Sequence, residues 1–254
     1  MRSRARSWRR ILSILLPVMA VGLIPDSHLF AQSFSFDFGE GPTASGRIFQ
    51  LITLLTVLSL APSILVMTTS FIRIVVVFSF LRSAMGLQQT PPNTVLIGQA
   101  LFMTLFIMMP VFEKAYEDGV APLLEDQIDE SAAMDLVAAP FRKFMLANVR
   151  SKDLELFMDV AKIDPPSDVG ETPYRVVIPA FVISELRRAF EIGFLLFVPF
   201  LIIDMVVASI LMSMGMMMLP PIIISLPFKM IFFVLVDGWY LVAGSLIQSF
   251  STGQ

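Results

Sequence analysis

The chain has 254 residues, a formal net charge of −3 and no cysteine, and 56% of its residues are hydrophobic against 15% charged. Its mean hydropathy of +0.79 is far too high for an ordinary soluble domain, so the composition predicts a membrane protein. The missing cysteines exclude disulfides, zinc–thiolate sites and iron–sulfur clusters, and the slight acidity gives no indication of nucleic-acid binding.

The first 31 residues have the order of a secretory signal peptide. Five arginines occur in the first ten residues, an apolar run follows over 11–24, and small Ala31 stands at a possible cleavage point. An uncleaved membrane anchor is the alternative, but we expect cleavage. The segment carries the only histidine, His28, so the mature chain would lack both His and Cys, which are common catalytic groups. Residues 32–46 are predicted to form a loose lead-in.

Residues 47–112 are predicted to form a first apolar helical hairpin. The run over 48–80 is longer than the roughly 20 residues that one helix needs to span a bilayer. Pro62 lies inside it and predicts a kink or two half-length pieces. Arg73 should face protein or water, because a charge facing lipid is costly. A polar turn and a second apolar run over 94–111 complete the hairpin.

Residues 113–178 are acidic, with fourteen acidic and seven basic residues. Apolar residues at helical spacing predict helices over 141–149 and 151–162, the second with Ser151 as its N-cap, and 163–173 is predicted to be a loop. If the signal peptide is cleaved, this region lies outside the cytoplasm. Its low content of Lys and Arg agrees with the positive-inside rule.

Residues 179–254 are predicted to form a second apolar hairpin with a methionine-rich tip. Five of the seven residues from Met212 to Met218 are methionines, and Gly215 with Pro220–Pro221 favours a non-helical bend there. One interpretation is apolar filling by a flexible side chain. The other is a deformable seal that closes against ions and yields to a passing chain.

Four charges lie in apolar surroundings, and such residues are either functional or paired. Asp204 and Lys229 are centred on the methionine run, so an antiparallel hairpin brings them to the same height. We predict that they form an ion pair, within the chain or across a subunit boundary, because each would be costly alone. Arg73 and Asp237 are the other two, and they are candidate structural or gating charges.

A charged patch, "SELRR" at 184–188 with Glu191, interrupts the same apolar region. It is either a solvated helix face with an Arg187–Glu191 pair at i,i+4 spacing, or a subunit contact or ring of charges at a pore mouth. The sequence contains no zinc-protease, nucleophile-elbow or phosphate-loop motif, and no suitable general base is assembled. We therefore expect no enzyme activity, cofactor or metal site.

Four segments resemble a known family: "SFIRIVVVFSFLRSAMGLQQTPPN", "PAFVISELRRAFEIGF", "PFLIIDMVVASILMSMGMMMLPP" and "LPFKMIFFVLVDGWYLVAGSLIQSF". They closely resemble the FliP/SctR family of type III export-gate proteins, and the resemblance covers residues 47–250. The prolines after the methionines and the "GSLIQSF" segment are more similar to the flagellar members than to the injectisome members.

This resemblance implies an all-α subunit of a ring-like gate at the flagellar basal body in the bacterial inner membrane. Five copies would assemble with FliQ and FliR, next to FlhB and FlhA, and would pass unfolded flagellar subunits. In that family the apparent membrane helices are bent hairpins, much of the assembled gate lies above the bilayer plane, and bends would account for Pro62, Pro199 and Pro227.

The resemblance also implies roles for particular residues. Met216, Met217 and Met218 would form the pore gasket, and Phe144, Phe157 and Arg150 would pack in the ring. Glu185 would be a further structural or gating charge. The alternatives are an injectisome gate subunit, a pure assembly scaffold, and a small-solute transporter or ion channel. A transporter would need internal repeats and a midplane binding site, and the sequence shows neither.

Overall fold

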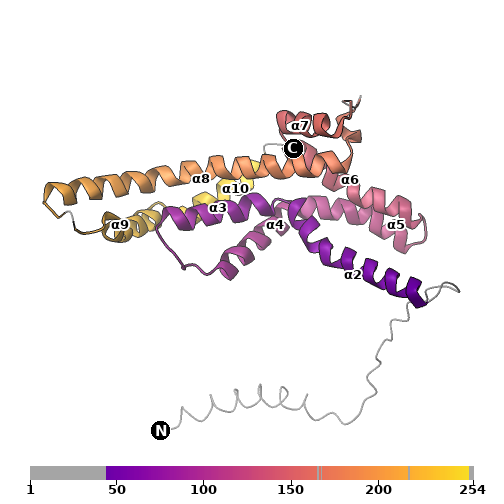
Figure 1. Ribbon diagram of the computed structural model, residues 1–254, viewed down its shortest axis with the longest axis horizontal. Helices are drawn as coiled ribbons and strands as arrows, with labels where there is room; N and C mark the ends of the chain where they lie inside the picture. Colours follow the sequence, from indigo (N-terminus) through magenta and orange to yellow (C-terminus); the bar gives the residue numbers. More distant parts are fainter. Residues whose placement is uncertain (1–43, 165, 167, 217, 252–254) are drawn as a thin grey trace, which may run out of the picture. The chain divides into compact units, whose positions relative to one another are not determined.

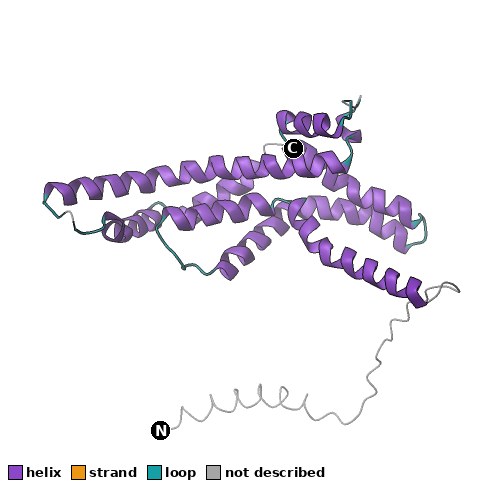
Figure 2. Cartoon of the chain, in the orientation of Figure 1, coloured by secondary structure: helices purple, strands orange, loops and turns teal. Residues whose placement is uncertain are grey.

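The computed structural model describes residues 44–251 except 165, 167 and 217, and every regular element in that part of the chain is a helix (Figure 2). The predicted all-α class is confirmed. Three of these helices are long and apolar enough to cross a membrane, and a bent helix pair could form a fourth span. The predicted signal peptide and most of the lead-in lie outside the described residues. The chain divides into two units, Met1–Leu54 and Leu55–Gln254, and the packing below concerns the second.

The first apolar run forms two helices, α2 (Ala44–Met67) and α3 (Phe71–Ala84). The two pieces agree with the prediction, but the break does not fall at Pro62, which lies inside α2. It falls at Thr68–Ser70. The Thr68 hydroxyl donates to the carbonyl of Ile64 at 3.0 Å and the Thr69 hydroxyl to that of Val66 at 3.4 Å. Such side-chain bonds compete with the helical ladder, so hydroxyl residues end this helix more effectively than the proline does.

Helix α4 (Asn93–Ala115) continues through a π-helical turn (Tyr116–Val120) into the short α5 (Ala121–Leu124). Helices α6 (Glu130–Asn148) and α7 (Ser151–Ala161) follow. Helix α7 is close to its predicted position, whereas α6 begins eleven residues before its predicted start and ends one residue before its predicted end. The predicted N-cap of α7 is wrong by one residue: Ser151 is the first helical residue, and Arg150 occupies the cap position with an extended backbone.

Helix α8 (Tyr174–Ser213) has 40 residues and begins five residues before its predicted start. At a rise of 1.5 Å per residue it is about 60 Å long, about twice the thickness of a bilayer's hydrocarbon core. It runs continuously through Pro179 and Pro199, although the resemblance implied a bend at Pro199. The boundary between the acidic region, which ends at residue 178, and the second apolar region therefore lies inside one continuous helix.

Two shorter helices, α9 (Pro221–Leu235) and α10 (Gly238–Ser251), complete the chain. The chain turns by 62° between them. Pro227 lies inside α9, and the turn occurs instead at Asp237, whose φ of 50° is left-handed. Asp tolerates this conformation better than most residues, because its short polar side chain can bond locally. Sequence reasoning assigned the bends to prolines and missed this one.

The core of the second unit is formed mainly where α3 lies along α8 (Figure 1). Helices α4, α6, α7, α9 and α10 add side chains to the same cluster. The acidic region is part of this core, because it contributes Phe144, Met145, Leu154 and Met158. Helices from both apolar regions and from the acidic region are thereby held together by one set of buried contacts.

Candidate functional site

The methionine tip begins where α8 ends in a Schellman motif. The Gly215 N–H donates to the carbonyl of Met212 at 3.1 Å, and the Met216 N–H donates to that of Leu211 at 2.9 Å. Gly215 has a φ of 75°, which glycine adopts without a steric cost. On the other side of the tip, Pro221 is the first residue of α9, where its missing N–H costs nothing. The predicted non-helical bend therefore lies between Gly215, after the end of α8, and Pro221, at the start of α9.

The described methionines of the tip project outward. Met218 is 98% exposed, Met214 64%, Met212 57% and Met216 44%, while Met217 lies outside the described residues. Their side chains therefore fill no gap inside this chain. A cluster of soft, flexible apolar groups is presented to whatever surrounds the tip.

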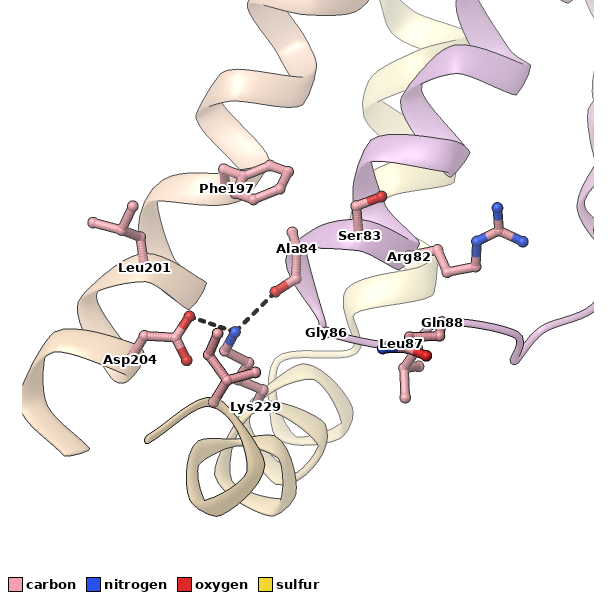
Figure 3. A pocket seen from close by; sticks show the side chains of 11 residues that line it. Arg82, Ser83, Ala84, Gly86, Leu87, Gln88, Phe197, Leu201, Asp204 and Lys229 are labelled. Atoms are coloured by element: carbon pink, nitrogen blue, oxygen red, sulfur yellow. Dashed lines mark hydrogen bonds and ion pairs between the residues drawn. The ribbon is translucent and has the colours of Figure 1, made fainter. Parts of the chain in front are cut away.

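The predicted pair of Asp204 and Lys229 is confirmed within the chain. Lys229 Nζ lies 2.6 Å from Asp204 Oδ2 and 3.2 Å from the carbonyl oxygen of Ala84, as Figure 3 shows. The Ser225 hydroxyl donates to the other carboxylate oxygen of Asp204. Ala84 is the last residue of α3, so its carbonyl has no partner within the helix and lies at the negative end of the dipole. One buried lysine thus joins α3, α8 and α9.

A cavity of about 550 Å³ lies beside this pair, lined on one side by Asp204 and Lys229 and on the other by the turn after α3 (Figure 3). Arg82 also lines it, but its guanidinium is turned away from the pair and bonds to the Asn93 side chain. Among the described residues no three His, Cys, Asp or Glu side chains are grouped so that they could hold a metal ion.

The structure brings together a second buried pair, Arg73 and Glu185, which sequence reasoning missed. Both side chains are completely buried. Arg73 Nε donates to one carboxylate oxygen of Glu185 at 2.8 Å and Nη2 donates to the other, the strong bidentate arrangement. The available signal was that each residue interrupts an apolar run and needs an opposite charge. No local pattern, however, connects residues 112 positions apart.

The same arginine fastens the end of α10. Its Nη1 donates to the carbonyl and to the hydroxyl of Ser249, at 3.1 and 2.9 Å. The guanidinium carbon lies 3.6 Å from the centre of the Phe250 ring, a cation–π contact. All the donor groups of Arg73 are thus directed at protein, as the cost of a charge in lipid requires.

The charged patch at 184–188 is divided between two faces of α8. On the exposed face, Arg187 and Glu191 pair at 2.9 Å, as the i,i+4 spacing predicts. On the buried face, the Ser184 hydroxyl donates to Asp153 Oδ2 at 2.6 Å and accepts from the Arg150 N–H at 3.1 Å. The Arg150 guanidinium, with help from Ser184, holds the pKa of Asp153 below its usual range, and Asp153 in turn raises the pKa of Arg150. These contacts fasten α7 to α8.

The three residues expected to pack in a ring are engaged inside the chain. The Phe144 ring is buried, 5.9 Å from that of Phe181 and 6.0 Å from that of Phe250. Phe157 packs partly buried against the core, and Arg150 makes two bonds of 2.9 Å to Asp153. Phe144 in particular has little surface left for a neighbouring subunit, because the core already covers it.

Asp237 is exposed, and in the described part of the chain its carboxylate has no ion-pair partner. Its backbone serves the turn between α9 and α10: its N–H donates to Val234 and its carbonyl accepts from Leu241, each at 3.1 Å. Its position is therefore explained by backbone conformation, while a gating role for its charge remains a prediction.

Long helices with exposed apolar faces, buried charges that are paired, and an outward methionine loop define an all-α membrane protein built to contact lipid or other chains. A model of the FliP family matches residues 54–246, and the chain belongs to that family, as the sequence resemblance predicted.

The chain is similar to several proteins named flagellar biosynthetic protein FliP. It is 55% identical to that of Caulobacter vibrioides over 253 residues, which are 99% of this chain and 95% of the relative. It is 50% identical to that of Rhizobium meliloti over 246 residues, 95% and 99% of the two chains. With that of Bacillus subtilis the identity is 55% over 201 residues, 79% and 91% of the chains.

Proposed function

We propose that this chain is a channel-forming subunit of the flagellar type III protein export gate in the bacterial inner membrane, passing unfolded flagellar subunits across it. The observation that carries the proposal is membership of the FliP family, with relatives named flagellar biosynthetic protein at 50–55% identity over almost their whole length. These names favour the flagellar assignment over the injectisome. No observation favours a small-solute transporter, and we infer no catalysis by the chain itself.

Assembly with other chains is the second part of the proposal. Helix α8 is about 60 Å long and exposes many large apolar side chains, more than one bilayer crossing needs. Such faces are stable when they are covered by lipid or by other subunits. From the family resemblance we propose a ring of five copies with FliQ and FliR at the basal body, in contact with FlhB and FlhA, after removal of the signal peptide.

Met216, Met217 and Met218 are proposed to seal the closed pore. Methionine is unbranched and has three rotatable bonds, so adjoining side chains from several copies can fill an irregular opening. An apolar constriction excludes ions because they would have to lose their hydration. The outward projection of Met216 and Met218 from the tip supports this role.

The test replaces all three residues at once, Met216→Ala, Met217→Ala and Met218→Ala, in a strain that lacks the native chain. We expect a lower membrane potential with export of flagellar subunits retained. The control carries Met205→Ala and Met230→Ala, which change exposed methionines on α8 and α9 away from the tip, and it should not leak. Normal potential with normal export in the triple variant would reject the seal and leave the export assignment standing.

A further inference from the structure

A second cavity, of about 370 Å³, lies between α4, α6 and α10. Its apolar lining includes Pro110 from α4 and Phe250 from α10. Its polar lining consists of Lys114, Lys143 and Asn148. None of these three belongs to the buried ion pairs or to the methionine tip described above, so the cavity is a separate feature.

Asn148 contributes a buried side-chain amide whose nitrogen is hydrogen-bonded within the described part of the chain and whose oxygen is not. The residue is 3% exposed, and its Nδ2 donates to the carbonyl of Phe144 at 3.0 Å. Its Oδ1 is buried and accepts no hydrogen bond from the described part of the chain. A buried acceptor without a donor is costly and rare. An occupant that brings a hydroxyl or an N–H into the cavity would supply the missing donor.

The two lysines give the cavity a positive rim. Lys114 lies in the last turn of α4, and its contact with Asp118, at 3.4 Å between two exposed side chains, is of the kind that contributes little. Lys143 is exposed on α6 and pairs with no carboxylate among the described residues. Two cations on either side of one opening favour an occupant with an anionic group.

The position of the cavity along α4 indicates the source of that group. The apolar stretch of α4 ends at Glu113 and Lys114, so this level corresponds to the headgroups if α4 spans a bilayer. Phe102 and Phe106 precede Pro110 at four-residue intervals on the same side of the helix, and they are 74% and 77% exposed. An apolar track for a hydrocarbon chain thus leads to the cavity.

We propose that this cavity binds the headgroup of an anionic glycerophospholipid that carries a free hydroxyl, of the phosphatidylglycerol type. Lys114 and Lys143 contact the phosphate, the hydroxyl donates to Asn148 Oδ1, and the acyl chains lie along Phe106 and Phe102. The cavity accommodates a headgroup, and the chains remain outside it. The proposal requires residence in a membrane and is independent of any role in export.

The test uses the full chain purified in detergent, freed of lipid and titrated with three lipids, with adducts counted by native mass spectrometry. Phosphatidylglycerol should bind more tightly than phosphatidylethanol, a phosphodiester of the same charge without a headgroup hydroxyl, and phosphatidylcholine, which has no net charge, should bind most weakly. Replacing both lysines, Lys114→Gln with Lys143→Gln, should weaken phosphatidylglycerol binding about thirtyfold, because each lysine near a headgroup contributes on the order of 1 kcal/mol. The control, Lys152→Gln with Lys162→Gln, makes the same charge change elsewhere and should bind as the unchanged chain does.

Two further variants separate the contributions. Asn148→Leu should remove the preference for phosphatidylglycerol over phosphatidylethanol while both still bind. Lys114→Arg with Lys143→Arg keeps the charge and should keep binding, which excludes misfolding as the cause of any loss. Equal phosphatidylglycerol binding by the glutamine variant and its control would overturn the proposal. So would loss of self-association by the glutamine variant with lipid binding unchanged, which would assign the cavity to a neighbouring copy.

Discussion

The two halves of α8 differ in both composition and surroundings: residues 174–193 include five charged residues, whereas residues 194–213 include only Asp204. In the first half, residues 174–193, eight side chains or glycines are buried against the rest of the chain, whereas in the second half, residues 194–213, only Phe200 and Leu211 are. The more apolar half is therefore the one that this chain leaves uncovered, for lipid or other subunits, while the half with more charges packs against the rest of the chain. The buried face of the first half carries small residues at four- or five-residue spacing, and these permit close helix packing: Ala180, Ser184, Ala189 and Gly193.

The charges of α8 differ in the same way. Glu185 in the first half is completely buried, and its carboxylate accepts two hydrogen bonds from Arg73. Asp204 in the second half keeps 31% of its side chain exposed, beside a cavity. The comparison implies that the first half is essential to the fold of the single subunit. The second half should tolerate more substitutions, because most of its side chains contact lipid or other subunits and not this chain.

The largest effect is expected from removing one member of the fully buried pair. Glu185→Ala leaves the Arg73 guanidinium buried without its carboxylate, which should lower the free energy of unfolding by about 3–5 kcal/mol. Thermal unfolding of the purified protein in detergent measures this. The control is Glu191→Ala, which breaks the exposed pair with Arg187 and should cost less than about 1 kcal/mol. Similar losses in both variants would remove the distinction between a buried and an exposed charge on α8.

A second replacement tests whether the pair itself stabilises the protein. Arg73→Met with Glu185→Met removes both charges and keeps apolar volume, so it should be less harmful than either single change. If the double variant is as unstable as Glu185→Ala, the contacts of Arg73 with Ser249 and Phe250 contribute more than its pairing does.

The next effect concerns the second half of the helix. Asp204→Asn should cost about 1.5–3 kcal/mol, the range for a hydrogen bond to a charged group. The cost is smaller than for Glu185 because Lys229 keeps the carbonyl of Ala84 and lies beside a cavity. Asp237→Asn is the matched control, since Asn also accepts the left-handed backbone at that position and the exposed carboxylate has no ion-pair partner in the described chain. A loss as large as that of Glu185→Ala would show that both halves hold their charges equally tightly.

These residues also show what could be predicted from the sequence. The two hairpin tips and the pairing of Asp204 with Lys229 followed from local spacing, because the chain folds back at a turn that glycine and proline mark. The all-α class was implied by the family resemblance. The pairing of Arg73 with Glu185 and of Asp153 with Ser184 did not, because it depends on which distant faces meet. The break at Thr68–Ser70 and the turn at Asp237 were missed because proline was taken as the stronger signal.

A smaller or similar effect is expected at the boundary between the two halves. A Cβ added at Gly193 would lie 2.5 Å from Cδ2 and 3.1 Å from Cβ of Phe80, so α3 or the ring must move. Gly193→Ala should therefore cost about 1–3 kcal/mol despite the better helix propensity of alanine. The control, Gly98→Ala in α4, meets no atom within 4 Å and should stabilise the protein by up to about 1 kcal/mol. Equal stabilisation by both changes would mean that α3 and α8 are not closely packed there.

The smallest effect is a dependence on pH in the middle of the first half, where Asp153 bonds to Ser184 and fastens α7 to α8. Arg150 and Ser184 hold the pKa of Asp153 below its usual range, so the folded protein binds this proton less readily than the unfolded chain does. The resulting stabilisation is present above the ordinary Asp pKa of about 4 and is lost as the pH falls through the lower, folded value. The difference in melting temperature between the unchanged chain and Asp153→Asn should accordingly be largest near neutral pH and shrink toward pH 3.

Asp159→Asn, on the exposed side of the same helix, removes an equal charge and serves as the control. If Asp153→Asn and Asp159→Asn behave alike at every pH, the hydrogen bonds to Arg150 and Ser184 do not favour the charged carboxylate. The first half of α8 would then hold α7 by apolar packing alone, through residues such as Leu154 and Met158.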